Sequence, residues 1–217
     1  MLSARREFLD KGYYEPVCMD IAQLINKYAP PSDSRVTADI GCGEGYYTAK
    51  LSSVCKGEYI GIDIAKEAAR MCCQRSRDIL WTVATASHLP LADESVDVMT
   101  AVFSLFVDNE YARVLKKGGI VIEVSAGSEH LIELKRVIYD EVFQQNKQQS
   151  PFSDSFELLH SDDRRLHITL PGDEIKALLA MTPHAHRISR EQSERLDNIS
   201  EMDITVNYKI RALAKRR

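Results

Sequence analysis

The sequence lacks the features that mark several classes of protein. Its five cysteines are odd in number and form no CxxC pair, which argues against a disulfide framework and against a Cys-rich zinc site. No apolar run approaches the roughly 20 residues that span a bilayer, and the N-terminus has no apolar signal-peptide core. We therefore expect reduced thiols, no membrane partner and a cytoplasmic location.

Positive charge is not in excess either. The 217 residues include 28 Lys and Arg against 32 Asp and Glu, which gives a net charge of −4. This net charge excludes a protein that coats nucleic acid by bulk charge, but it is compatible with a local basic patch. Hydrophobic residues make up 44% and charged residues 28%, as in ordinary globular domains. We predict a helical segment at residues 1–30 followed by one domain at residues 31–217.

Short β-branched runs alternate with helical segments in the first part of the chain. The predicted strands are residues 36–40, 58–64, 79–84, 96–103 and 120–125, and the predicted helices are residues 46–54, 66–76 and 109–115. The sequence KKGG at 116–119 is predicted to be a turn. Such alternation predicts βαβ units and a mainly parallel sheet.

The last third of the chain has a different pattern. We predict a helix over 130–143, a polar loop over 144–155, a strand over 165–170 and a helix over 173–181. Ser189 and Gln192 have the spacing of a capping box that opens another helix. Alternating apolar residues over 203–213 predict a last strand, which we expect at an antiparallel edge of the sheet.

The sharpest motif is the glycine-rich segment Asp39-Ile40-Gly41-Cys42-Gly43-Glu44-Gly45, between a predicted strand and a predicted helix. Glycines let the backbone turn tightly and let a ligand approach it closely. The helix N-terminus then offers free N–H groups to an anionic group. Asp63 ends the next strand, 22 residues after Gly41, which is the approximate spacing of a carboxylate that binds ribose hydroxyls.

Two cofactor classes compete for this loop. A dinucleotide fingerprint needs a small residue where this chain has Tyr46, which is too bulky for that close packing. The GxGxG form with Asp39 two residues before the first glycine suits S-adenosyl-L-methionine (SAM) instead. SAM offers a carboxylate, an amino group and a ribose to the loop, and yields S-adenosylhomocysteine as product.

Further motifs lie beyond the loop, namely Leu89-Pro90-Leu91-Ala92-Asp93, Ser95-Val96-Asp97 and Arg113-Val114-Leu115-Lys116-Lys117-Gly118-Gly119. Together with the loop they resemble class I SAM-dependent methyltransferases over residues 36–127. The resemblance implies an α/β, Rossmann-like fold with a seven-stranded, mostly parallel sheet and helices on both faces. It also implies that Ala86 and Ser87 lie by the adenine, and that Phe103 and Ser104 border the methyl donor.

A narrower resemblance runs over nearly the whole chain. Its motifs are Ala4-Arg5-Arg6 with Phe8-Leu9-Asp10, Gly12 and Tyr14, the segment 39–48, His130-Leu131 with Glu133-Leu134-Lys135, Gly172-Asp173-Glu174, and Met181-Thr182-Pro183. This series resembles the bacterial 23S rRNA (guanine-N1-)-methyltransferases. The resemblance implies methyl transfer to N1 of a guanine in an rRNA hairpin, and a homodimer. It further implies SAM contacts from Tyr14, Gly43, Glu44 and His130.

The chain departs from that family at two places. Family members usually begin with a Cys-rich zinc-binding module that helps to hold RNA, and this sequence starts after it, so we expect no zinc here. His184 and His186 follow Pro183 where the family has an aromatic residue, and they lack a third ligand for a metal site. A methyltransferase of small molecules and a non-catalytic SAM-binding protein stay open as alternatives. No residue is singled out as catalytic base, and Phe103, Phe106 and Phe152 are candidates for stacking on the acceptor base.

Overall fold

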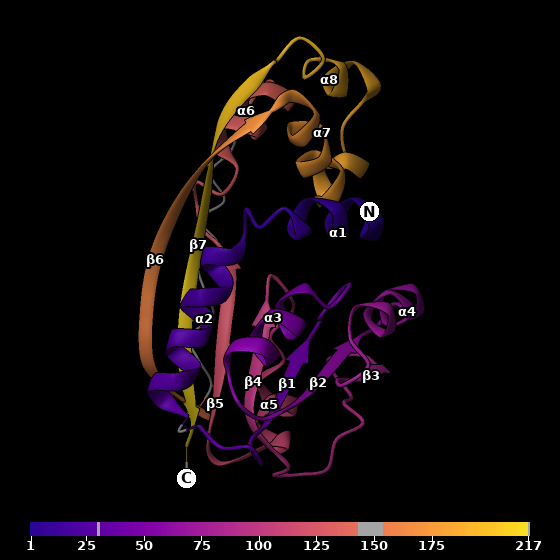
Figure 1. Cartoon of the computed structure of the whole chain (residues 1–217). Coiled ribbons are helices and arrows are strands. Elements are labelled where there is room, and N and C mark those ends of the chain that lie inside the picture. Colours follow the sequence, from indigo (N-terminus) through magenta and orange to yellow (C-terminus); the bar gives the residue numbers. More distant parts are fainter. Residues whose placement is uncertain (30, 143–153, 217) are drawn as a thin grey trace. The chain divides into compact units, whose positions relative to one another are not determined.

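The computed structural model describes residues 1–29, 31–142 and 154–216, and Figure 1 shows how its elements are arranged. Seven strands form one sheet in the order β3-β2-β1-β4-β5-β7-β6. The strands are β1 Val36–Ile40, β2 Glu58–Asp63, β3 Leu80–Val83, β4 Val96–Val102, β5 Leu115–Ala126, β6 Phe156–Pro171 and β7 Glu201–Lys215. The helices are α1 Leu2–Asp10, α2 Glu15–Tyr28, α3 Tyr46–Val54, α4 Lys66–Arg75, α5 Asp108–Val114, α6 Ile132–Ile138, α7 Gly172–Met181 and α8 Arg190–Glu194, with a short 3₁₀ turn η1 at Pro183–His186.

The predicted α/β fold is confirmed, because the sheet is mostly parallel with helices packed on it. The first five strands pair in parallel, with β1 between β2 and β4. The helices α3 and α4 connect β1 to β2 and β2 to β3, which makes two βαβ units. Buried apolar residues such as Ile40, Met99 and Val121 form the core of this part of the sheet. Because such strands are covered on both sides, their sequences are nearly continuous apolar runs.

The prediction that the last strand is an edge was wrong. β7 lies between β5 and β6, and it forms the antiparallel pairs of the sheet. The edge strand next to β7 is β6, which is far longer than the predicted 165–170 because it begins at Phe156. No element is predicted for residues 156–164, which include the polar run HSDDR at 160–164, yet charged side chains on an edge strand also prevent pairing with other chains.

The predicted turn at 116–119 is also corrected. β5 runs from Leu115 through these residues, and its pairing with β4 jumps from Val96↔Leu115 to Val98↔Ile120. The extra residues are accommodated where Gly118 has a φ of +77°. The glycines therefore allow an irregularity inside the strand rather than a turn before it.

Contacts within the chain group the residues in two units. The larger unit contains residues 16–125, the described part of 149–162, and 209–216; the smaller unit contains residues 1–15, the described part of 126–148, and 163–208. In the smaller unit α1 packs with α7 and α6 with α8. In the larger unit α2 buries Val17, Ile21 and Ile25 along one face. No helix in the described ranges is long and apolar enough to cross a membrane.

Local signals in the smaller unit have mixed outcomes. The capping box is confirmed, because the Ser189 side chain accepts the Gln192 N–H and the Gln192 side chain accepts the Ser189 N–H. The helix expected over 130–143 is shorter, since α6 spans Ile132–Ile138 and is preceded by Leu131 in the left-handed region. Most of the polar loop expected over 144–155, with Phe152, lies outside the described residues.

Candidate functional site

The glycine-rich loop makes a tight turn between β1 and α3 in the larger unit. Gly41, Gly43 and Gly45 have φ values of +75°, +57° and +84°, all in the left-handed region. The N–H groups of Gly41 and Cys42 donate to the Ile62 carbonyl at 2.8 and 3.1 Å, so the loop is fixed to the end of β2. Only glycine adopts this run of left-handed conformations without strain, which explains the three alternate glycines.

The carboxyl ends of β1 and β4 approach each other closely beside this loop. A Cβ on Gly41 would lie 2.6 Å from the Ser104 Cβ, and the Ser104 hydroxyl donates to the Ile40 carbonyl at 2.6 Å. After β1 the chain adds β2 and then β3 on one side of β1, and it then adds β4 on the other side. In open α/β sheets, ligands bind at such a point, beyond the carboxyl ends of the strands.

The residues after β4 are in unusual conformations for their types. Phe103 has a φ of +52°, and its N–H donates to the Val124 carbonyl at 2.8 Å. Leu105 is 69% exposed, although it follows a buried strand. A bulky residue at positive φ stores local strain, and such residues cluster at functional sites. Phe106, in contrast, packs edge-on against Tyr111 and Phe156 with ring centroids 4.9 and 5.6 Å apart, so it serves the core.

Asp39 is buried and both of its carboxylate oxygens accept hydroxyl hydrogen bonds. Thr48 of α3 donates to Oδ2 at 2.5 Å, and Thr100 of β4 donates to Oδ1 at 2.8 Å. The carboxylate therefore ties β1 to the helix that follows the glycine loop and to β4 on the other side of the switch point. Asp39 therefore stabilises the position of the loop through its hydrogen bonds with Thr48 and Thr100.

Asp63 ends β2 and is oriented toward the glycine loop. Its Oδ2 accepts the Gly43 N–H at 2.8 Å and its Oδ1 accepts the Ala65 N–H at 2.8 Å. Each carboxylate oxygen has a second lone pair, so both can still accept a hydroxyl hydrogen bond. Ile64 beside it is 73% exposed and offers an apolar surface. This combination of an oriented carboxylate and an apolar patch fits a nucleoside.

Glu44 faces the helix that follows β2. The side chain is fully buried, and its Oε2 lies 2.6 Å from Nη2 of Arg75 at the end of α4. The Arg75 Nε also donates to the Glu44 carbonyl at 3.1 Å. This ion pair holds the middle of the loop, and it directs the Glu44 carboxylate toward α4.

Trp81 of β3 packs under the loop. A Cβ on Gly45 would lie 2.9 Å from the indole, and a Cβ on Gly61 would lie 2.2 Å from it. Both glycines are therefore needed for packing, and Gly45, with its φ of +84°, is needed for conformation as well. Cys42 and Cys72 lie in the same layer, and both sulfurs approach the Gly43 carbonyl. Hydrogen bonding to Cys72 and burial raise the pKa of the Cys42 thiol, which keeps it protonated.

Ala86 and Ser87 follow β3 in a short turn. The Ser87 and Thr85 hydroxyls are 3.0 Å apart, and the His88 N–H donates to the Thr85 carbonyl at 3.1 Å. Ser87 is exposed, while Ala86 packs against the core. The turn lies at the carboxyl end of β3, the same end of the sheet as the glycine loop and Asp63.

Tyr14 and His130 belong to the smaller unit, so their part in a cofactor site stays a prediction. Tyr14 is buried against Phe8 with ring centroids 6.0 Å apart, and burial raises its pKa. The Nδ1 atom of His130 lies 2.8 Å from the Asn207 carbonyl. Burial lowers the pKa of His130 to about 4, so the imidazole is neutral at physiological pH.

His184, which replaces a family aromatic residue, forms a pair with Tyr139. The Tyr139 hydroxyl lies 2.8 Å from Nδ1 of His184. Burial lowers the pKa of His184, with Lys135 as a further cause. Over the described ranges, His, Cys, Asp and Glu side chains form no group of three placed to hold a metal ion.

Comparisons with known proteins place these observations in a family. A methyltransferase domain family matches residues 38–122, which include the glycine loop, Asp63 and the end of β4. YxjB of Bacillus subtilis, provisionally named a 23S rRNA (guanine-N1-)-methyltransferase, is 30% identical over 210 residues, covering 92% of this chain and 73% of that protein. The chain belongs to the 23S rRNA (guanine-N1-)-methyltransferase family. It is therefore a SAM-dependent methyltransferase.

Two further matches agree with this assignment. The 23S rRNA (guanine(748)-N1)-methyltransferase of Streptomyces fradiae is 26% identical over 219 residues, covering 97% of this chain and 78% of that protein. The crystal structure of YcgJ from Bacillus subtilis aligns with a TM-score of 0.57 at 20% identity, over 90% of this chain and 98% of that one. This structural likeness concerns the fold alone, which is the predicted class I methyltransferase fold.

Some residues of the site escaped sequence analysis. Arg75, Thr48 and Thr100 fix the loop and its acid, and Ile64 supplies the exposed apolar surface. The position of an isoleucine directly after the strand-ending Asp63 is a signal that the sequence contains, whereas its exposure comes from the structure. The partners of Asp39 and Glu44 had no such signal, because they come from other elements.

Proposed function

We propose that this methyltransferase transfers a methyl group from SAM to N1 of a guanine in 23S rRNA, in the cytoplasm. The observation that carries the proposal is the identity to the named rRNA methyltransferases, which extends over both units rather than over the cofactor domain alone. A match confined to residues 38–122 would support only a methyltransferase of undefined substrate.

The residues at the carboxyl ends of β1, β2 and β4 fit SAM. The backbone of Gly41 and Gly43 allows close approach of the amino acid part, next to the N-terminus of α3. Asp63 has lone pairs for the ribose hydroxyls, and we assign Ile64, Ala86 and Ser87, which lie at the same end of the sheet, to the adenine. Asp39 and Glu44 support the loop through Thr48 and Arg75. The family resemblance also assigns SAM contacts to Tyr14 and His130.

SAM supplies a methyl group on a sulfonium, which is already a good leaving group, so alignment of donor and acceptor provides much of the acceleration. Phe103 and Leu105 follow β4, on the side of the loop where an acceptor base would enter. A flipped guanine would stack on such side chains. The proton on guanine N1 has to leave as the methyl arrives, and we assign no residue to that task.

The family resemblance leads us to propose also that two chains pair to hold the RNA. Size-exclusion chromatography with light scattering over a hundredfold range of concentration tests this. A mass twice that of the chain is expected, and a constant monomer mass would contradict it.

The experiment for the proposed function uses a transcript of the 23S rRNA hairpins and SAM with a labelled methyl group. We expect label to enter the unmodified transcript. The matched control is the same transcript carrying 1-methylguanosine at the target, which should take up none. Equal labelling of both transcripts, or labelling only of small molecules from a cell extract, would contradict the proposal. Mutation of Asp63 to Ala should abolish the labelling at low SAM.

A further inference from the structure

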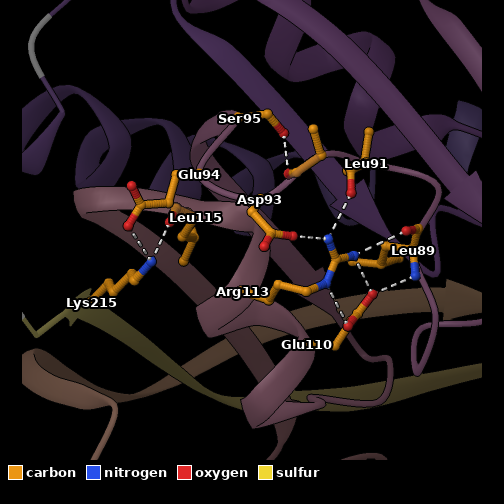
Figure 2. Close-up of polar contacts among 10 residues, drawn as sticks. Leu89, Leu91, Asp93, Glu94, Ser95, Glu110, Arg113, Leu115 and Lys215 are labelled. Carbon is orange, nitrogen blue, oxygen red and sulfur yellow. Dashed lines mark hydrogen bonds and ion pairs between the residues drawn. The ribbon is translucent and has the colours of Figure 1, made fainter.

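A polar cluster centred on Arg113 joins the end of α5 to the segment between β3 and β4 (Figure 2). The Nε and Nη2 atoms of Arg113 donate to the two Glu110 carboxylate oxygens at 3.0 and 2.6 Å. Its Nη1 binds Asp93 Oδ1 at 2.6 Å and the Leu91 carbonyl at 2.9 Å, and Nη2 also binds the Leu89 carbonyl at 3.1 Å. All five guanidinium donors are therefore used.

Glu110 forms the second half of the cluster. Its Oε1 accepts the Leu89 N–H at 2.6 Å in addition to the bond from Arg113. The backbone of Leu89 is thus held at its N–H by Glu110 and at its carbonyl by Arg113, and its side chain is buried in the core.

Leu89 is the downstream anchor of the 85–88 turn, which carries Ala86 and Ser87. At the upstream end, the Ala84 N–H donates to the Asp63 carbonyl at 3.1 Å. The turn is closed by the bond from the His88 N–H to the Thr85 carbonyl. The turn is therefore fixed at one end to the strand-ending carboxylate residue and at the other end to the Arg113–Glu110 pair.

We propose that Arg113 and Glu110 are positioning residues for the adenosine half of SAM. They hold the 85–88 turn at a set place relative to Asp63, so that the binding surface for base and ribose exists before the cofactor arrives. A surface that is already ordered avoids the cost of ordering a loop on binding. The inference rests on the proposed SAM site, and neither residue is assigned a contact with the cofactor.

Replacement of Arg113 by lysine keeps the charge but leaves three donors on a single nitrogen in place of a planar fork with five. At least two of the bonds to Glu110, Asp93, Leu89 and Leu91 are then lost, and the turn gains freedom. Glu110→Gln keeps the shape but removes the negative charge that faces Arg113. Both variants are predicted to bind SAM more weakly while the transfer step itself is unaffected.

The test compares Arg113→Lys and Glu110→Gln with the wild-type chain and with Arg70→Lys. Arg70 forms an exposed pair with Glu67 at the same spacing of three residues, so its lysine variant is a matched control. The SAM dissociation constant is measured by calorimetry at a temperature at which circular dichroism shows every variant folded. Methyl transfer to the rRNA transcript gives kcat and the KM for SAM.

We expect the dissociation constant and KM for SAM to rise about tenfold in both cluster variants, which is about 1.4 kcal/mol. The value of kcat at saturating SAM should stay within about twofold of wild type, and Arg70→Lys should match wild type. Unchanged SAM affinity with a lowered melting temperature would overturn the inference, because the cluster would then only stabilise the fold. A fall in kcat without a change in KM would also overturn it.

Failure of the proposed function gives a different result. If the wild-type chain itself binds no SAM, the cofactor site and this inference both fall. If Arg113→Lys does not fold, the isosteric Glu110→Gln variant is used for the same comparison. An unchanged SAM affinity in that variant would overturn this inference and leave the proposed function standing.

Discussion

Gly41 and Ser104 approach so closely that a Cβ on the glycine would lie 2.6 Å from the Ser104 Cβ. This contact joins the ends of β1 and β4, and the hydrogen bond from Ser104 to the Ile40 carbonyl beside it links residues 64 apart in sequence. It brings the glycine loop against the start of the segment that contains Phe103 and Leu105. The loop proposed to bind the methyl donor therefore lies directly beside the segment proposed to receive the acceptor base.

The first prediction concerns Gly41→Ala. It should lower the free energy of unfolding by about 3 kcal/mol, because the new methyl group overlaps Ser104 and the left-handed backbone is strained. Gly118→Ala is the matched control, since Gly118 also has positive φ, at +77°, but its Cβ would meet no atom within 4 Å. That variant should lose only about 1 kcal/mol. Urea unfolding of both variants measures the difference, and equal losses would mean that the Ser104 contact is easily relaxed.

Asp63→Ala should weaken SAM binding about 10- to 100-fold, because charge-assisted hydrogen bonds to the ribose are lost, and it should lower the melting temperature, because the Gly43 and Ala65 N–H groups lose their acceptor. Calorimetric titration measures the affinity. Asp33→Ala serves as the control, since the Asp33 side chain is 88% exposed and pairs only loosely with Lys56. Wild-type affinity in the Asp63 variant would remove this residue from the cofactor site.

The Glu44–Arg75 pair should be strongly coupled. Arg75→Met leaves the buried Glu44 carboxylate without its guanidinium, and we expect a loss of about 3 kcal/mol in the free energy of unfolding. The double variant Glu44→Gln with Arg75→Met should lose less than the sum of the two single losses. A double-mutant cycle by denaturant unfolding tests this, and strict additivity would show that the two side chains act independently.

The neutral state of His130 gives a pH prediction. Its pKa is about 4 in the folded chain and about 6.5 when unfolded, so the unfolded state binds more protons between these values. The contribution of His130 to stability is therefore complete above about pH 6.5 and is lost as the pH falls toward 4. Exchanging His130 for Asn should flatten the stability profile in that window. An NMR titration in which the His130 signal moves near pH 6.5 would contradict the prediction.

Much of the fold could be predicted from local patterns, and the exceptions have physical causes. Residues 36–40 and 46–54 form a strand and a helix with the predicted bounds, because buried apolar runs and a glycine turn are local signals. β6 was mostly missed because its charged residues 160–165 belong to an edge, where polarity and strand structure are compatible. β7 is an internal strand because it pairs with both β5 and β6, and no local sequence pattern predicts which strands pair.

In the candidate site, too, some residues could be predicted from the sequence and others could not. The glycine loop and Asp63 could be found by spacing, since the residues that form them are close in sequence or end consecutive strands. The Arg113 cluster could not, although its motif was noticed, because three of its five donors reach acceptors on a segment 20 to 24 residues earlier. Packing of Trp81 under Gly45 and Gly61 likewise appears only when the parallel strands are paired.

The central claim is methyl transfer to N1 of a guanine in 23S rRNA, and the chemical identity of the product tests it most directly. The transcript methylated by the chain is digested to nucleosides and analysed by mass spectrometry against synthetic standards. We predict 1-methylguanosine, formed at one position and absent without SAM. Methylation at another atom or base, or no methylated nucleoside from a chain that binds SAM, would contradict the account.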